Sequence, residues 1–141
     1  MSEVNKFYIS YERQLELEHY CKQVPEWQEE LSSLTEVKAA QWYEDYVIAK
    51  GGEVKDPTYA FAIRKVMLEV RIKNILDLID KVAEMYGEDK KEIYIYREIL
   101  DKSIIDGIGY YAMQGIEETV SLTKYRTMMR HFFWLLDKRR D

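Results

Sequence analysis

The sequence contains few of the residues that build disulfides and zinc sites. Cys21 is its only cysteine, so no internal disulfide can form, which is typical of a protein from a reducing cytoplasm. The two histidines, His19 and His131, are more than a hundred residues apart and cannot make a zinc site with one cysteine. Because Cys21 lies in a helical pattern, we predict that it is a small buried hydrophobic residue and not a catalytic nucleophile.

The sequence also lacks the long apolar runs that membranes require, and its N-terminus has no apolar signal-peptide core. We therefore expect a cytoplasmic protein with no membrane partner. Phosphate-binding loops, dinucleotide fingerprints and calcium loops are missing as well. Carboxylate pairs such as Glu117 and Glu118 fit a solvated helical face better than acid–base catalysis. The expectation is a protein that is not an enzyme, with no cofactor, no metal and no small-molecule substrate.

The composition indicates a folded helical chain. Of the 141 residues, 47% are apolar and 33% are charged, which excludes a disordered chain. Twelve tyrosines suit a core that reaches the surface, and also protein interfaces. No period-two pattern indicates a strand. We predict an all-α helical bundle with a long central helix and a C-terminal helix-turn-helix, divided into an N-terminal bundle and dimerisation region (1–87) and a helix-turn-helix region (88–141).

The two prolines mark helix starts. Pro25 suits the first turn of one helix, and Asp56-Pro57 combines an N-cap with proline at the first helical position. The glycine pair at 51–52 and Gly87 end helices. In the first helix, an inward face is formed by Phe7, Tyr11, Leu15, Tyr20, Cys21 and Val24. The predicted helices cover residues 5–24, 26–34, 36–49, 57–86, 88–103, 110–119 and 123–138.

The helix predicted over residues 57–86 carries two apolar stripes. One alternates by four and three residues, as in a coiled coil. It contains Leu68, Ile72, Ile75, Ile79, Val82 and Tyr86. The other covers the first half of the helix and contains Tyr59, Ile63, Val66 and Val70. Two stripes need two partners, which are the N-terminal helices and a second copy of the chain, or else two surfaces within one monomer.

The stretch from Ile116 to Arg140 reads as a short helix, a turn at Leu122 and a longer helix that Thr123 caps. Apolar residues of the longer helix recur at helical spacing: Met128, Phe132, Leu135 and Leu136. Lys124, Arg126 and Arg130 fall largely off that stripe. The six basic and two acidic residues of 122–141 leave a net charge of +4, whereas residues 1–121 carry −9. A basic outer face is typical of a DNA-reading helix, but also of a packing helix whose basic C-terminus complements its dipole.

Three stretches of the chain follow a known order of elements: YERQLELEHYCKQVPEWQEEL, GGEVKDPTYAFAIRKVMLEVRIKNIL and KEIYIYREILDKSIIDGIGYYAMQGIEETVSLTKYRTMMRHFFWLL. Together they resemble phage and prophage transcriptional activators of the ArpU-like and RinA-like type. The last stretch is similar to a sigma-factor-like ending. The chain departs from the pattern at Glu117, where a small residue is usual, so this glutamate must turn outward or tilt the helices. Gly115 weakens the first helix by roughly 1 kcal/mol relative to alanine.

The resemblance implies a DNA-binding regulator of phage genes that works as a homodimer on double-stranded DNA, with RNA polymerase as a further partner. The helix from Thr123 would lie in the major groove. Its expected DNA-binding residues are Thr123, Lys124, Tyr125, Arg126, Thr127, Arg130, Lys138, Arg139 and Arg140. The alternative is a phage-encoded protein-interaction module with a degenerate helix-turn-helix, which the acidic body and the apolar last helix favour.

Overall fold

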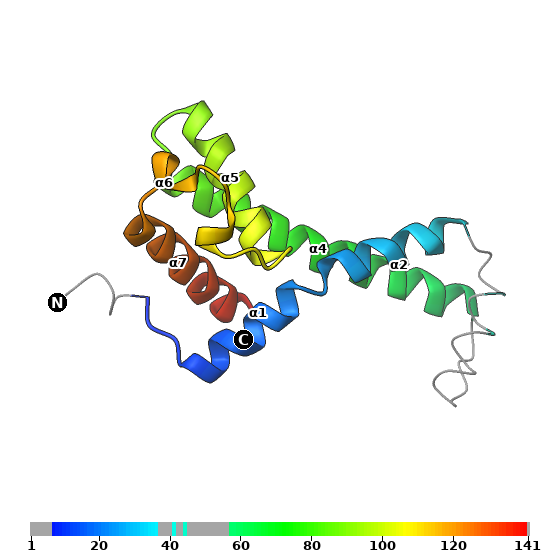
Figure 1. Ribbon diagram of the computed structural model, residues 1–141. Coiled ribbons are helices and arrows are strands. Elements are labelled where there is room, and N and C mark those ends of the chain that lie inside the picture. Colours follow the sequence, from blue (N-terminus) through cyan, green and yellow to red (C-terminus); the bar gives the residue numbers. More distant parts are fainter. Residues whose placement is uncertain (1–6, 37–40, 42–43, 45–56, 141) are drawn as a thin grey trace. The chain divides into compact units, whose positions relative to one another are not determined.

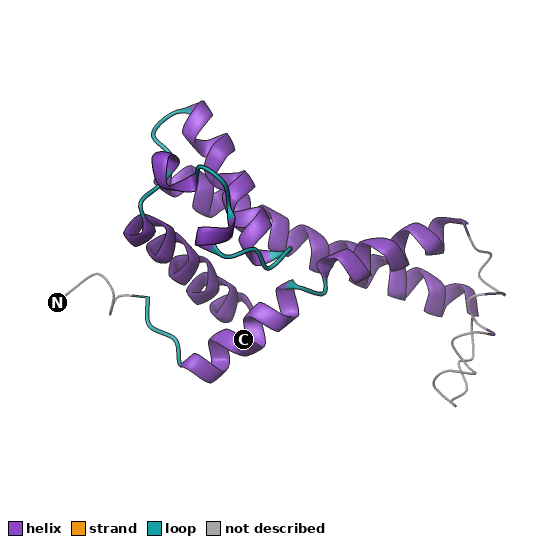
Figure 2. Ribbon diagram, viewed as in Figure 1, coloured by secondary structure: helices purple, strands orange, loops and turns teal. Residues whose placement is uncertain are grey.

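The computed structural model describes residues 7–36, 41, 44 and 57–140. Within these ranges the chain forms helices and loops without a strand (Figure 2), which confirms the all-α prediction. The same ranges contain no helix that is long and apolar enough to cross a membrane. The elements are α1 (Tyr11–Cys21), α2 (Val24–Glu36), α4 (Pro57–Tyr86), α5 (Lys90–Ile104), the 3₁₀ helix η2 (Tyr110–Ala112), α6 (Ile116–Thr119) and α7 (Leu122–Arg140) (Figure 1).

The chain divides into two compact units. The larger unit comprises Met1–Val24 and Ile75–Asp141, and the smaller unit comprises Pro25–Asn74. Helix α4 contributes residues to both. The boundary expected after residue 87 falls inside the larger unit. The helix predicted over 36–49 lies almost entirely outside the described residues.

Helix α1 is shorter than the helix expected over residues 5–24. Ser10 caps it, because its side-chain oxygen accepts a hydrogen bond from the Arg13 backbone N–H at 3.2 Å. The inward face also differs: Leu17 and Cys21 are buried, whereas Tyr11 is 75% exposed. The expectation that Cys21 is buried is confirmed, and the placement of Tyr11 on the inner face is wrong.

Helix α4 runs over Pro57–Tyr86, as predicted. It ends at Gly87, whose N–H donates to the Ala83 carbonyl. The reason for glycine is close approach rather than a left-handed backbone, since a Cβ at this position would lie 2.6 Å from Ile93 Cγ1 and 2.8 Å from the Ile93 nitrogen. Gly87 thus allows the chain to turn directly into α5.

In the smaller unit, α2 and the first part of α4 run antiparallel (Figure 1). Arg64 holds Glu30 with two hydrogen bonds of 2.6 and 2.8 Å, and the Arg71 guanidinium lies 5.7 Å from the centre of the Trp27 ring. The paired Arg64 lowers the pKa of Glu30 below its usual value. The apolar side chains buried in this unit include Trp27, Leu34, Leu68 and Ile72.

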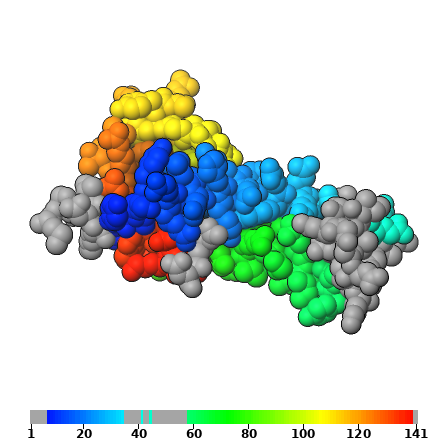
Figure 3. Space-filling model, turned by 90° about the horizontal axis from the view of Figure 1, so that it is seen from below, coloured from blue at the N-terminus to red at the C-terminus, as the bar shows by residue number. Residues whose placement is uncertain are grey.

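The larger unit has the main hydrophobic core. Helix α1, drawn in blue, packs against α7, drawn in red (Figure 3). Phe7 stacks on His131 with ring centroids 4.0 Å apart, and Tyr86 Oη lies 2.9 Å from His131 Nδ1. The largest fully buried side chains of this unit include Leu17, Ile75, Leu78, Ile79, Val82, Leu100, Ile104, Met128, Phe132 and Phe133.

Candidate nucleic-acid interface on helix α7

Helix α7 begins at Leu122, one residue before the start of the predicted helix over 123–138. Ser121, not Thr123, is the capping residue: its hydroxyl oxygen accepts a hydrogen bond from the Lys124 backbone N–H at 3.1 Å. Its carbonyl accepts the first helical bond, from the Tyr125 N–H at 2.9 Å. Thr123 is therefore a residue of the exposed first turn, and Leu122 is helical instead of lying in a turn.

The segment before α7 is not the continuous helix that was predicted over residues 110–119. It consists of η2, an extended Met113, Gly115 at φ 76° and the single turn of α6. The left-handed backbone at Gly115 interrupts the helix, and the Tyr110 hydroxyl fixes the segment by donating to the Val120 carbonyl at 2.7 Å. Glu117 is exposed, so of the two outcomes expected for it, turning outward or tilting the helices, the structure has the first, and the neighbouring Ile116 is buried.

Two of the residues expected to read bases face the protein instead. The Lys124 ammonium lies 4.9 Å from the centre of the Tyr96 ring, on α5. The Tyr96 side chain, and to a lesser extent Glu92 and Glu88, raise the pKa of Lys124 above its usual value. The Tyr125 hydroxyl lies 2.6 Å from Ser103 Oγ, which also donates to the Ile108 carbonyl. Both residues therefore hold α7 against α5 and the loop that follows α5.

The exposed face at the start of α7 carries the remaining candidates. Thr123 and Arg126 are exposed, and Arg130 is partly exposed. They are spaced by three and four residues, so they share one face of the helix. Thr127 lies beside them, but its hydroxyl donates to the Thr123 carbonyl at 2.9 Å. Within the described part of the chain, neither arginine forms an ion pair, so both guanidinium groups remain available to a ligand.

The C-terminal end of α7 is partly occupied by contacts within the larger unit. Arg13 of α1 donates from Nε to the Asp137 carboxylate. The Lys138 ammonium lies 3.9 Å from the centre of the Trp134 ring, and Arg139 is exposed. Arg140 is the last helical residue, and its side chain lies outside the described set. Sequence reasoning missed the Arg13–Asp137 pair because nothing local connects residues 124 positions apart.

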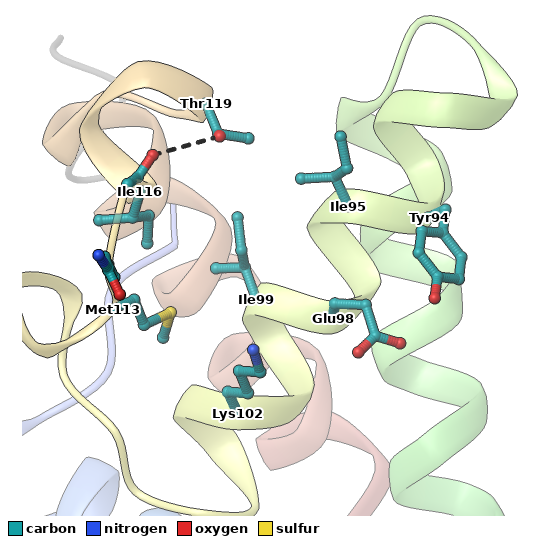
Figure 4. Close-up of a pocket in the computed structure, with 10 residues that line it drawn as sticks. Tyr94, Ile95, Glu98, Ile99, Lys102, Met113, Ile116 and Thr119 are labelled. Carbon is teal, nitrogen blue, oxygen red and sulfur yellow. Dashed lines mark hydrogen bonds between the residues drawn. The ribbon is translucent and has the colours of Figure 1, made fainter.

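A shallow groove of about 200 Å³ lies between α5 and residues 113–119 (Figure 4). Its side chains are mainly apolar: Ile95, Ile99, Met113 and Ile116 face the hollow, and Lys102 reaches toward it. Because the polar groups at its edge are solvated, the groove has the character of a contact site for an apolar side chain rather than a reaction centre.

Comparisons with protein-family models, curated proteins and solved structures found no match for this chain. The first half of α7 presents Thr123, Arg126 and the partly exposed Arg130 on one face. Elsewhere in the described ranges, no group of three or more His, Cys, Asp or Glu residues is arranged to hold a metal ion. The surface of α7 is thus suited to an anionic ligand held by arginine.

Proposed function

We propose that this chain is a DNA-binding transcriptional regulator whose helix α7 enters the major groove. The observation that supports it is the shared exposed face of Thr123, Arg126 and Arg130 at the beginning of α7. Arginine is the side chain that most often reads guanine, with two parallel hydrogen bonds to the base edge, and it also holds phosphates. The N-terminal part of a recognition helix is the part that contacts bases.

The spacing of the exposed residues along α7 limits which bases they can contact. Thr123 and Arg130 are seven residues apart, which is about 10 Å along the helix and matches roughly three base-pair steps. Arg126 lies between them on the same face. Lys138, Arg139 and Arg140 remain candidates for phosphate contact, which positions a protein without reading sequence. Lys124 and Tyr125 act indirectly in this proposal, because they hold α7 in place.

The regulatory role rests on the resemblance to phage and prophage activators of the ArpU-like and RinA-like type. That resemblance covers nearly the whole chain and includes the segment that forms α7. This resemblance implies a cytoplasmic protein that binds operator DNA and contacts RNA polymerase. The one-turn helix α6 and the glutamates before α7 make the element a reduced helix-turn-helix, so α7 must supply most of the affinity for DNA.

The test is binding of the full chain to duplex DNA over a salt series, first with random sequence and then with a selected site. The proposal expects the logarithm of the binding constant to fall linearly with the logarithm of salt concentration. Arg126→Gln with Arg130→Gln should weaken binding to the selected site at least about tenfold, with a smaller loss on random DNA. No binding at low salt would rule the proposal out.

A matched double variant at the other end of the helix makes the test specific. Lys138→Gln with Arg139→Gln removes the same charge, and it should weaken binding equally on selected and random DNA, because phosphate contacts carry no sequence information. If both double variants lost the same affinity on both DNAs, α7 would not be reading bases. Circular dichroism and thermal unfolding show whether each variant keeps its fold.

The groove beside α5 supports a second candidate, the protein-interaction module. Its apolar lining of Ile95, Ile99, Met113 and Ile116 has room for one large apolar side chain of a partner. Under this alternative the wild-type chain binds no DNA at low salt but forms a stable complex with RNA polymerase or another protein. Met113→Asp, at a partly exposed position of the groove, would abolish that complex and leave the exposed face of α7 unchanged.

A further inference from the structure

The outward face of α7 is open in its first half only. Thr123, Arg126 and Arg130 share this face, and at about 100° per residue Trp134 and Asp137 continue it toward the C-terminus. Neither of these two later residues is fully exposed, and both contact the N-terminal part of the chain. The open part of the face therefore ends about one turn beyond Arg130.

Two contacts hold the N-terminal part of the chain across this face. At one end, the Phe7 ring meets the Trp134 ring edge-on, with the ring centroids 5.2 Å apart. At the other end, Arg13 of α1 donates from Nε to the Asp137 carboxylate. Trp134 and Asp137 lie about 60° apart around the helix, one on each side of the middle of the face. The chain between the two contacts thus crosses the face, and we refer to it, residues 7–13, as the strap.

The strap belongs to the packed fold of the larger unit. Ser10 caps α1 inside it, and the helix that follows is anchored by Leu17 and Cys21, which are completely buried. The strap therefore stays in place when a ligand approaches α7. It crosses α7 about 6 to 10 Å beyond Arg130, so α7 can enter a groove of DNA by its first half but not along its whole length.

Two tyrosines of the strap extend into solvent. Tyr8 is 72% exposed and Tyr11 is 75% exposed. Among the residues that the structure describes, neither hydroxyl has a hydrogen-bond partner. A tyrosine hydroxyl is one of the neutral donors that proteins use to hold DNA phosphates. Single exposed tyrosines are common on protein surfaces, but these two lie on the segment that ends the open face of α7.

We propose that the strap binds the sugar–phosphate backbone at the edge of the groove that α7 enters, with the Tyr8 and Tyr11 hydroxyls donating to phosphate oxygens. This inference rests on the proposed DNA binding and deepens it, because it adds two contacts and sets how far α7 enters. Phosphate contacts fix the register of a protein on DNA without reading sequence. The strap thus positions the protein, and Arg126 and Arg130 read the bases.

Charges of both signs surround the strap. Arg13 holds two carboxylates, those of Glu16 at 2.9 Å and of Asp137, and Glu12 is exposed next to Tyr11. The partly or fully exposed basic residues of α7 near the strap are Arg130, Lys138 and Arg139. Because the two signs nearly cancel, the contact depends on the neutral hydroxyl donors and not on net charge. Glu12 itself opposes a phosphate that passes the strap, since like charges repel.

Binding of the full chain to the selected site and to random duplex DNA tests the two tyrosines. Tyr8→Phe and Tyr11→Phe should each weaken binding at least about threefold on both DNAs, because phosphates are common to both. The salt dependence should stay the same, since a neutral donor releases no counterions. Tyr94→Phe is the matched control and should leave binding unchanged: Tyr94 is 57% exposed on α5, the helix that holds α7 from its inner side.

Glu12 provides a test of opposite sign. Glu12→Gln should strengthen binding at least about twofold on both DNAs, because it removes a carboxylate beside the phosphates. Glu98→Gln removes the same charge from an exposed position of α5. It should change the affinity less, so the comparison separates a charge beside the strap from the net charge of the protein.

The inference is wrong if both tyrosine variants bind like Tyr94→Phe, or if Glu12→Gln binds like Glu98→Gln. When wild type binds the selected site and the Arg126 and Arg130 double variant weakens that binding, these results remove the strap contact alone. Absence of wild-type binding at low salt removes the strap contact and the proposed function together. Thermal unfolding shows whether each variant keeps its fold, and none of these exposed substitutions should lower the melting temperature.

Discussion

The two halves of α4 carry the same spacing of branched aliphatic residues but bury them differently. In the larger unit, Ile75, Ile79 and Val82 are completely or almost completely buried. In the smaller unit, Ile63 and Val66 belong to a second stripe of the same spacing, on the opposite side of the helix from the buried Leu68, and they remain about half exposed. Spacing and residue type therefore specify that a helix forms and which of its faces are apolar. They do not specify whether a neighbour covers each face.

The number of surrounding helices explains the difference. The second half of α4 shares its unit with α1, α5 and α7, so apolar residues on several sides find partners. The first half has α2 beside it among the described helices of the smaller unit. Among the described helices, α2 covers one face of this half, and the apolar residues of the opposite face stay partly exposed. Variants in the two halves can test this comparison directly.

The largest difference is expected between Ile79→Ala and Ile63→Ala. Ile79 is 1% exposed, so its truncation leaves a cavity and should lower the free energy of unfolding by about 3 kcal/mol. The same truncation at Ile63 should cost less than about 1 kcal/mol, since much of that side chain is already in water. Urea unfolding at low protein concentration measures both values.

The two variants remove the same atoms from the same helix, so each is the control of the other. Similar losses would mean that the first half of α4 is covered by another part of the monomer.

A smaller effect is expected at the hydrogen bonds that hold α7 in the larger unit. Tyr125→Phe removes the hydroxyl that lies 2.6 Å from Ser103 Oγ, and it should lower the free energy of unfolding by about 1 kcal/mol. The ring contact with Tyr110 remains. Tyr111→Phe removes a hydroxyl from an exposed side chain and should change little. Thermal unfolding compares the two, and equal effects would show that the buried bond contributes nothing.

The smallest effects concern pH, and they have opposite signs in the two units. The hydrogen bonds from Arg64 lower the pKa of Glu30, so this pair stabilises the smaller unit above the usual glutamate range and the contribution is lost as pH falls through the lowered pKa. Burial, with Asp106 and Glu98 nearby, raises the pKa of Asp101. Its charge therefore destabilises the larger unit at neutral pH, and the penalty is relieved as pH falls through the raised pKa toward the usual aspartate range.

Hydrogen exchange at pH 7 and near pH 4 can follow each unit separately. Acid should speed hydrogen exchange in α2 relative to α5. The corresponding change in the free energy of local opening should be no more than about 1 kcal/mol, because both carboxylates are partly solvated. Glu30→Gln should remove the first effect and Asp101→Asn the second. Identical acid responses in the two single variants would show that neither carboxylate is responsible.

Local signals in the sequence predicted the parts of the fold that local physics decides. The proline after Asp56 and the glycine at 87 marked the ends of α4 correctly. The expected helix over 110–119 failed because one backbone conformation, the left-handed Gly115, outweighed the apolar spacing around it. The N-cap of α7 is Ser121 and not the predicted Thr123. Both serine and threonine suit an N-cap, and only the geometry of the preceding segment decides which of the two residues takes that position.

The candidate site was predictable in part. Helical spacing placed Arg126 and Arg130 on one side of α7, where the structure also has them. Spacing did not reveal that Lys124 and Tyr125 are turned toward α5, because their partners, Tyr96 and Ser103, lie more than twenty residues earlier. Which basic residue is exposed thus depends on tertiary contacts.

Those contacts also set the rotation of α7 about its own axis. Lys124 and Tyr125 attach the start of the helix to α5 and its following loop, and Asp137 attaches the end to Arg13 of α1. Each residue of an α-helix turns the chain by about 100°, so inserting one residue between the two attachments would force them out of phase. The helix would have to release one attachment or rotate, and Arg126 and Arg130 would then point to different directions. The contacts on the inner face of α7 therefore determine the direction in which Arg126 and Arg130 point.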